Sequence, residues 1–208
     1  MIFLSSNPDW TSTVREEIQN LISTHNPPLT STSGDPLIQA LSAIPLASWE
    51  SKTPSLELCI RETLRSAQPH TAVRKNVGPE FNIGPYTVPS GSFVAYPFTD
   101  TFMNPTYYPD PMHWNPARII QKDVPFLGWG SGKHVCKGQK LATLTMKLVA
   151  AYALMRYDFT MVDRQGLKLQ SCPTPDLNDF LTCRPMEECS IEFTQRSSKL
   201  DHSKEAML

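Results

Sequence analysis

The stretch GWGSGKHVCKG, from Gly128 to Gly138, surrounds one cysteine, Cys136, with glycines, a tryptophan and a histidine. The apolar run QKLATLTMKLVAAYALMRY follows it and predicts a helix over residues 139–157 that is buried almost all round. Cys136 therefore lies just before a helix, where backbone amides and the helix dipole stabilise a thiolate over a thiol. The sequence thus places a candidate anionic sulfur at this point of the chain.

The glycines around this cysteine favour a ligand-binding loop. Gly130, Gly132 and Gly138 would let the backbone approach a large flat ligand and would direct amides toward the sulfur. Two other interpretations stay open at this point. The cysteine could be a small buried core residue, or His134 and Cys136 could supply two ligands to zinc, although no second ligand pair with finger-like spacing follows.

Elsewhere the sequence predicts a mainly α fold with small β-hairpins. Helical periodicity is found in three segments: residues 8–24 after Asn7 as N-cap, residues 37–44, and the segment SLELCIRETLRSA after Thr53 and Pro54. Short runs broken by GP and PSG predict hairpins between Phe81 and Tyr96. Frequent aromatic side chains between Pro97 and Pro125 predict an ordered coil held by its rings.

Composition and charge limit the class of protein. The 208 residues are enough for one domain, and 19 basic residues against 20 acidic residues give a net charge of −1. This balance provides no basic surface for nucleic acid and no polybasic segment for a membrane. Lys140 and Lys147 interrupt the apolar run, which argues against a membrane-spanning segment in this chain.

Cysteine usage points to free thiols. The chain has an odd number of cysteines without the spacing of a disulfide framework: Cys59, Cys136, Cys172, Cys183 and Cys189. The apolar run in the opening MIFLSSNPDW is also too short for a secretory signal peptide. Together these features favour a reducing compartment.

Three motifs carry a resemblance to a known family. WGSGKHVCKG resembles the haem-binding loop of the haem-thiolate monooxygenases, the cytochrome P450 superfamily, whose usual form is Phe-Gly-x-Gly-x-basic-x-Cys-x-Gly. The matching positions are Gly130, Gly132, His134, Cys136 and Gly138, and Trp129 stands where the family usually has phenylalanine. The segment ETLR resembles the family's Glu-x-x-Arg motif through Glu62 and Arg65. WNPARI resembles the aromatic-x-Pro-x-Arg segment through Arg118, with Ala117 in place of the common glutamate.

The resemblance implies roles for individual residues. It implies haem b (iron protoporphyrin IX) with Cys136 as the axial thiolate and metal ligand, and no separate catalytic side chain. Arg74 and His134 correspond to positions that pair with haem propionates, and residues 68–73 would line part of the substrate pocket. Glu62, Arg65 and Arg118 would form a buried structural triad. The alternatives are a strand-edge cation at Arg74 and a solvent-exposed helical pair at Glu62 and Arg65.

The resemblance also implies a domain and an activity. Residues 1–196 correspond to the C-terminal, proximal portion of the cytochrome P450 fold, from about the J helix through the K helix, the haem-binding loop, the L helix and the C-terminal strands. Residues 197–208 form a polar tail. The segments PHTA and YPDP are similar to those of fungal members. The expected reaction inserts one oxygen atom from O₂ into a small apolar organic substrate in fungal secondary metabolism, with electrons from an NADPH-cytochrome P450 reductase.

Two further expectations concern activity and location. No Ala-Gly-x-x-Thr-like segment precedes Asn7, so we expect the isolated chain to be inactive. The alternative function is a truncated, non-catalytic haem-binding remnant that lacks the distal half. By family, the location is the endoplasmic reticulum membrane facing the cytosol. Because no anchor is visible, the chain expressed as it stands is expected in the cytoplasm.

Overall fold

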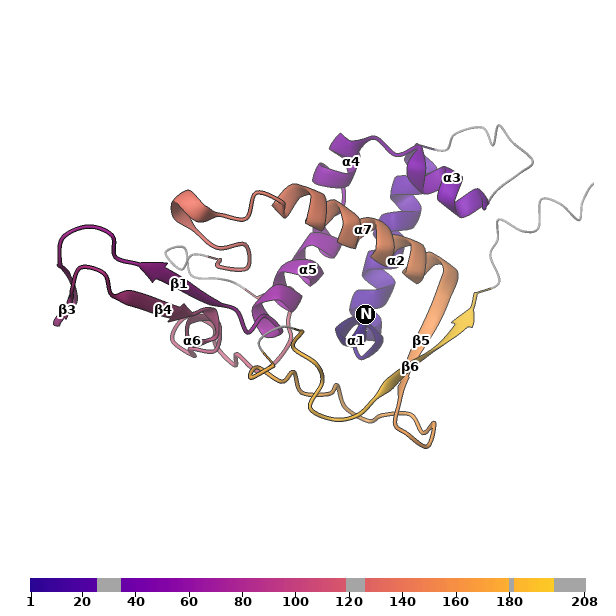
Figure 1. Cartoon of the computed structure of the whole chain (residues 1–208). Coiled ribbons are helices and arrows are strands. Elements are labelled where there is room, and N and C mark those ends of the chain that lie inside the picture. Colours follow the sequence, from indigo (N-terminus) through magenta and orange to yellow (C-terminus); the bar gives the residue numbers. More distant parts are fainter. Residues whose placement is uncertain (26–34, 119–125, 180–181, 197–208) are drawn as a thin grey trace, which may run out of the picture. The chain divides into compact units, whose positions relative to one another are not determined.

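The computed structural model describes residues 1–25, 35–118, 126–179 and 182–196. Within these ranges it is mainly helical with small antiparallel sheets, which confirms the predicted fold class (Figure 1). The chain divides into two compact units. Unit 1 consists of Met1–Arg61, Lys137–Thr174 and Pro185–Leu208, and unit 2 consists of Glu62–Cys136 and Pro175–Arg184.

Unit 1 is built from helices around α7. Its helices are α1 (Ile2–Ser5), α2 (Pro8–Thr24), α3 (Pro36–Ser42), α4 (Leu46–Ser51), α7 (Gln139–Arg156) and the first part of α5 (Pro54–Ser66). Helices α2, α3, α5 and α7 confirm the predicted segments. The short helices α1 and α4 were not predicted, because four to six residues are too few to show a helical period. In Figure 1, α7 runs across α2, and both α3 and α4 contact α7.

The core of unit 1 follows the apolar face of α2. Val14 and Ile18 are fully buried, and Leu21 is nearly so. Ala151 and Leu154 of α7 are also fully buried. The spacing of the α2 residues is the helical period that predicted this face from the sequence.

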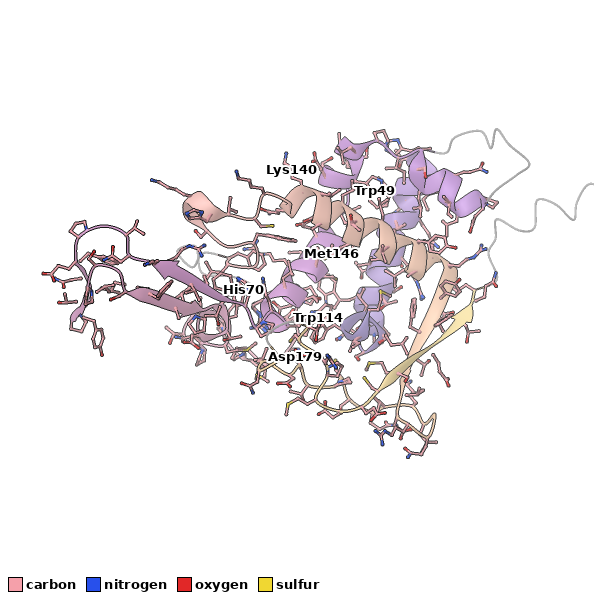
Figure 2. The ribbon with its side chains drawn as sticks, in the orientation of Figure 1. Trp49, His70, Trp114, Lys140, Met146 and Asp179 are labelled. Carbon is pink, nitrogen blue, oxygen red and sulfur yellow. The ribbon has the colours of Figure 1, made fainter. Side chains whose placement is uncertain are left out.

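Helix α7 differs from the prediction in its burial. Leu141 and Val149 are 71% and 62% exposed, so the prediction of a helix buried almost all round is wrong. Lys147, in contrast, is 4% exposed, and its Nζ donates to the Trp49 carbonyl at 3.0 Å and pairs with Glu57 at 2.7 Å. Figure 2 shows Trp49 on α4. The apolar composition of a helix does not show which of its faces pack against other elements. Within unit 1, only part of the surface of α7 is covered.

At the N-termini of α2 and α5, the side chains that the sequence suggests as caps make other hydrogen bonds. Asn7 is the N-cap residue of α2, but its side-chain amide donates to the Phe3 carbonyl at 2.7 Å and so closes α1. The Thr53 hydroxyl, expected to cap α5, donates to the Trp49 carbonyl at 2.7 Å. The first amides of α5 are instead bound by the Glu17 carboxylate of α2, which lies 2.7 Å from Ser55 N and 3.0 Å from Leu56 N. A carboxylate at this end also interacts favourably with the helix dipole.

A two-stranded antiparallel sheet completes unit 1. Strand β5 (Tyr157–Val162) pairs with β6 (Ser190–Gln195), and Tyr157 lies opposite Gln195. Arg15 of α2 joins this sheet to the end of α7, because its guanidinium donates to the carbonyls of Leu154 at 2.9 Å and Tyr157 at 2.8 Å. The same group pairs with Asp158 at 2.7 Å.

Unit 2 contains two small ribbons. Strand β1 (Thr71–Lys75) pairs with β4 (Phe93–Pro97), and β2 (Phe81–Ile83) pairs with β3 (Tyr86–Val88), all antiparallel. The β2–β3 hairpin confirms the prediction for this region. Strand β4 differs, because it pairs with the earlier strand β1 and not with its neighbour in the sequence.

The aromatic segment after β4 packs as a core. Phe98, Phe102, Tyr108 and Leu127 form a buried cluster, and the rings of Phe102 and Tyr108 meet edge to face with centroids 6.0 Å apart. The predicted ring-held coil is confirmed over residues 98–118 except for one short helix, α6 (Phe98–Phe102), and Pro97 belongs to β4. Residues 119–125 of that prediction and the predicted tail, 197–208, lie outside the described residues.

Among the residues described by the structure, no helix combines the length and the apolar character needed to cross a bilayer.

Candidate functional site

Glu62 is the centre of a buried ionic network on the second half of α5. Its carboxylate accepts two hydrogen bonds from Arg65, Nε at 2.9 Å and Nη2 at 2.8 Å. It also accepts from the Asn115 amide at 3.0 Å and from Arg118 Nε at 3.2 Å. Glu62 is 5% exposed and Arg65 is 1% exposed. The structure therefore brings the three charged residues together, and their burial contradicts the alternative of a solvent-exposed helical pair.

Arg65 makes two further hydrogen bonds. Its Nη1 donates to the Phe102 carbonyl at 2.9 Å and its Nη2 donates to the Ser66 hydroxyl at 2.9 Å. The guanidinium carbon lies 5.4 Å from the centre of the Tyr108 ring. This arrangement joins α5 to α6 and to the aromatic core, and it satisfies a buried charge that would otherwise be costly.

Arg118 organises the coil that precedes it. Besides Glu62, its guanidinium donates to the carbonyls of Pro109, Asp110 and His113. A single side chain thereby fixes the path of residues 109–118. Ala117 is exposed, so the absence of the family's glutamate at this position leaves the network intact.

The predicted cysteine lies in a closed glycine loop. The Gly130 amide donates to the Leu127 carbonyl at 2.8 Å, and the Cys136 amide donates to the Trp129 carbonyl at 2.8 Å. One 3₁₀ turn, η1 (Gly132–His134), lies between these two bonds. Gly130 and Gly132 have φ angles of +75° and +69°, which favour glycine because a side chain would be strained there.

Cys136 differs from the other cysteines in its surroundings. All five cysteines are free in the described chain, and Cys136 is exposed whereas Cys59 is buried. Burial, with a smaller contribution from the Glu17 carboxylate, raises the pKa of the Cys59 thiol to about 12. Burial also raises the pKa of Cys172 and of Cys183. Among the five cysteines, the exposed one is therefore Cys136 in the glycine loop.

Of the other predicted site residues, three lie in or next to this loop, and Arg74 lies on a separate strand. Trp129 is half-buried, His134 is exposed in η1, and Gly138 is the N-cap of α7. Arg74 is exposed on β1, and the hydrogen bond of its Nη1 is local, to the Val73 carbonyl at 2.9 Å. Figure 2 shows the side chains around these elements, with His70 labelled just before β1.

The residues present fit a group that needs one protein ligand. Among the residues that the structure describes, no cluster of three or more His, Cys, Asp or Glu side chains could hold a metal ion. A zinc site on His134 and Cys136 therefore has no further protein ligands in that part of the chain. The surface at Gly132 is open, since an added Cβ would meet no atom within 4 Å. An exposed thiol on a solvent-accessible glycine loop suits a large planar group that needs a single ligand from the protein.

Comparison with known proteins decides the family. Residues 1–182 match the cytochrome P450 family. This chain belongs to the cytochrome P450 family. Cytochrome P450 monooxygenase AacuE of Aspergillus aculeatus is 35% identical over 173 residues, which cover 78% of this chain and 34% of that protein. Cytochrome P450 monooxygenase nsrP of Aspergillus novofumigatus is 33% identical over 177 residues, which cover 80% of this chain and 33% of that protein. The chain thus spans about a third of the length of these curated relatives.

Solved structures show the same fold. The retinoic acid-bound cyanobacterial CYP120A1 has a TM-score of 0.65 at 23% identity, over 93% of this chain and 40% of that one. A zebra fish cytochrome P450 with abiraterone has a TM-score of 0.67 at 21% identity, over 94% of this chain and 42% of that one. The predicted resemblance and the partial P450 fold are confirmed. Membership of this P450 family implies a haem-thiolate cofactor.

Proposed function

We propose that Cys136 is the axial thiolate ligand of haem b and that the chain serves in a P450-type monooxygenation. The observation that carries the proposal is the closed glycine loop, which presents a free and exposed thiol and is anchored by the Cys136 N–H···O=C bond to Trp129. The three sequence motifs and the fungal relatives support it.

We expect the other predicted site residues to help to hold the haem. Trp129, Gly130, Gly132 and Gly138 would shape the loop, and His134 and Arg74 would pair with the haem propionates. The Glu62–Arg65–Arg118 network holds the coil over residues 109–118. When bound, the haem with its electron-donating thiolate supplies the activation of O₂, from which one oxygen atom enters the substrate.

The proposed substrate is a small apolar organic molecule, and residues 68–73 would line part of its pocket. Relatives from Aspergillus favour a reaction of fungal secondary metabolism. Electrons would come from an NADPH-cytochrome P450 reductase. Residues 1–196 would act as one partial P450 domain, with 197–208 as a tail, and the location would follow the family at the endoplasmic reticulum.

The reduced, CO-bound absorption spectrum tests the ligand directly. The wild-type chain loaded with haem should give the thiolate-type spectrum, and Cys136→His should abolish it. The matched controls are Ser substitutions at the four other cysteines: Cys59, Cys172, Cys183 and Cys189. Loss of the spectrum in one of these controls, with retention in Cys136→His, would refute the assignment.

A second measurement separates an enzyme from a haem-binding protein. The loaded chain is supplied with NADPH, reductase and an apolar substrate, and hydroxylated product is measured. Product formation at about 1 per second or faster would support catalysis by this chain itself. A thiolate-type spectrum without product would favour the non-catalytic haem-binding alternative.

A further inference from the structure

Gly128 lies in a tightly packed environment, and it lies outside the family motif. A Cβ atom at this position would lie 2.4 Å from Phe126 Cζ, 2.6 Å from Phe126 Cε1 and 3.3 Å from Leu64 Cβ. Real Cβ atoms do not approach other heavy atoms below 3.0 Å. Gly128 does not have a positive φ angle, so glycine is required here by space and not by backbone conformation.

The two neighbours that a side chain would meet are both half-buried, and each has contacts that restrain it. The Phe126 ring packs against the Phe102 ring with centroids 5.9 Å apart, and Phe102 is fully buried. Leu64 lies on α5 between Glu62 and Arg65, which are fixed by the buried network. Because these contacts restrain both neighbours, we expect part of the displacement caused by a larger residue to fall on the backbone at position 128.

The backbone on both sides of Gly128 anchors the cysteine loop. The Leu127 carbonyl accepts from Gly130 N, and the Trp129 carbonyl accepts from Cys136 N, each at 2.8 Å. Movement at position 128 therefore changes both acceptors. We propose that Gly128 is a positioning residue that seats the loop against α5 and thereby fixes Cys136. This inference rests on the proposed function of Cys136 as a haem ligand.

The test is Gly128→Ala, read first by amide hydrogen exchange in the chain without haem. The Cys136 amide should exchange roughly fivefold to tenfold faster, as expected when one hydrogen bond is weakened. In the haem-loaded chain, Gly128→Ala should also lower the thiolate-type fraction of the CO spectrum. The matched control is Gly78→Ala, where the new Cβ would meet only Asn76 Oδ1 at 3.7 Å. Both readouts should be unchanged in this control.

A second substitution tests the steric cause. Phe126→Leu removes the ring atoms that meet the new methyl group, so Gly128→Ala/Phe126→Leu should exchange at the Cys136 amide as slowly as Phe126→Leu alone. Unchanged exchange in Gly128→Ala, no rescue in the double variant, or an unchanged CO spectrum would each overturn the positioning role. A chain that binds no haem would contradict the proposed function, and the exchange data would still decide whether Gly128 seats the loop.

Discussion

Replacing Glu62 with glutamine removes the charge from a carboxylate that is 5% exposed. Both of its oxygens accept from Arg65, and one of them also accepts from Asn115 N and Arg118 Nε. The glutamine amide would place a donor where one of these oxygens accepts from Arg65. The guanidinium groups of Arg65 and Arg118 would then lose the negative charge that they share inside unit 2.

The magnitude follows from the burial of the network. Removing one partner of a buried, hydrogen-bonded ion pair costs about 3–5 kcal/mol, which is roughly a 10²- to 10⁴-fold change in the unfolding equilibrium. The matched control is Glu188→Gln. Glu188 pairs with Arg164, but these side chains are 62% and 70% exposed. Solvent screens such a pair, so this change should cost about 1 kcal/mol or less.

Urea unfolding provides the assay, with tryptophan fluorescence as the signal. Trp114 is 6% exposed and its Nε1 donates to the Thr63 hydroxyl at 3.3 Å, so it reports on the part of α5 that carries the network. The free energy of unfolding is extrapolated to water for both variants and the wild type. A loss in Glu62→Gln no larger than that in Glu188→Gln would refute the reasoning, because it would show that burial adds nothing to this network.

Three other substitutions test which contacts stabilise unit 1 and how the stability contributed by one of its thiols depends on pH. Arg15→Met should lower the free energy of unfolding by about 1.5–3 kcal/mol, because the Leu154 carbonyl and its neighbours lose a charged donor; urea unfolding measures this. Glu17→Gln should cost about 1 kcal/mol, since α5 loses a charged cap, whereas the exposed Glu16→Gln should change stability by less than about 0.5 kcal/mol; equal losses would contradict the capping role. The Cys59 thiol has a pKa of about 12 in the folded chain against an ordinary 9.0, so the unfolded state releases its proton first and stability should fall as the pH rises from 9 toward 12. The urea midpoint should fall less steeply with pH over that range in Cys59→Ala than in the wild type. An identical pH dependence would show that folding does not raise the pKa of this thiol.

Local spacing in the sequence predicted much of this protein. The glycine loop around Cys136, the periodic faces of α2 and α5, and the Glu62–Arg65 spacing are each contained within a few residues. Such features depend on short-range geometry, namely the helical period and the freedom of glycine. For this reason the fold class and the P450 resemblance could be predicted without any knowledge of distant contacts.

The tertiary structure alone decided which groups meet across long separations in the chain. Glu62 finds the Asn115 amide, β4 pairs with β1, Glu17 caps α5, and Lys147 is buried while Leu141 on the same helix is exposed. The hydrophobic composition of a helix is the same whichever of its faces is covered. A hydrogen-bond donor can likewise pair with any acceptor that packing brings within reach. These outcomes depend on how whole elements pack, and no short stretch of sequence contains that information.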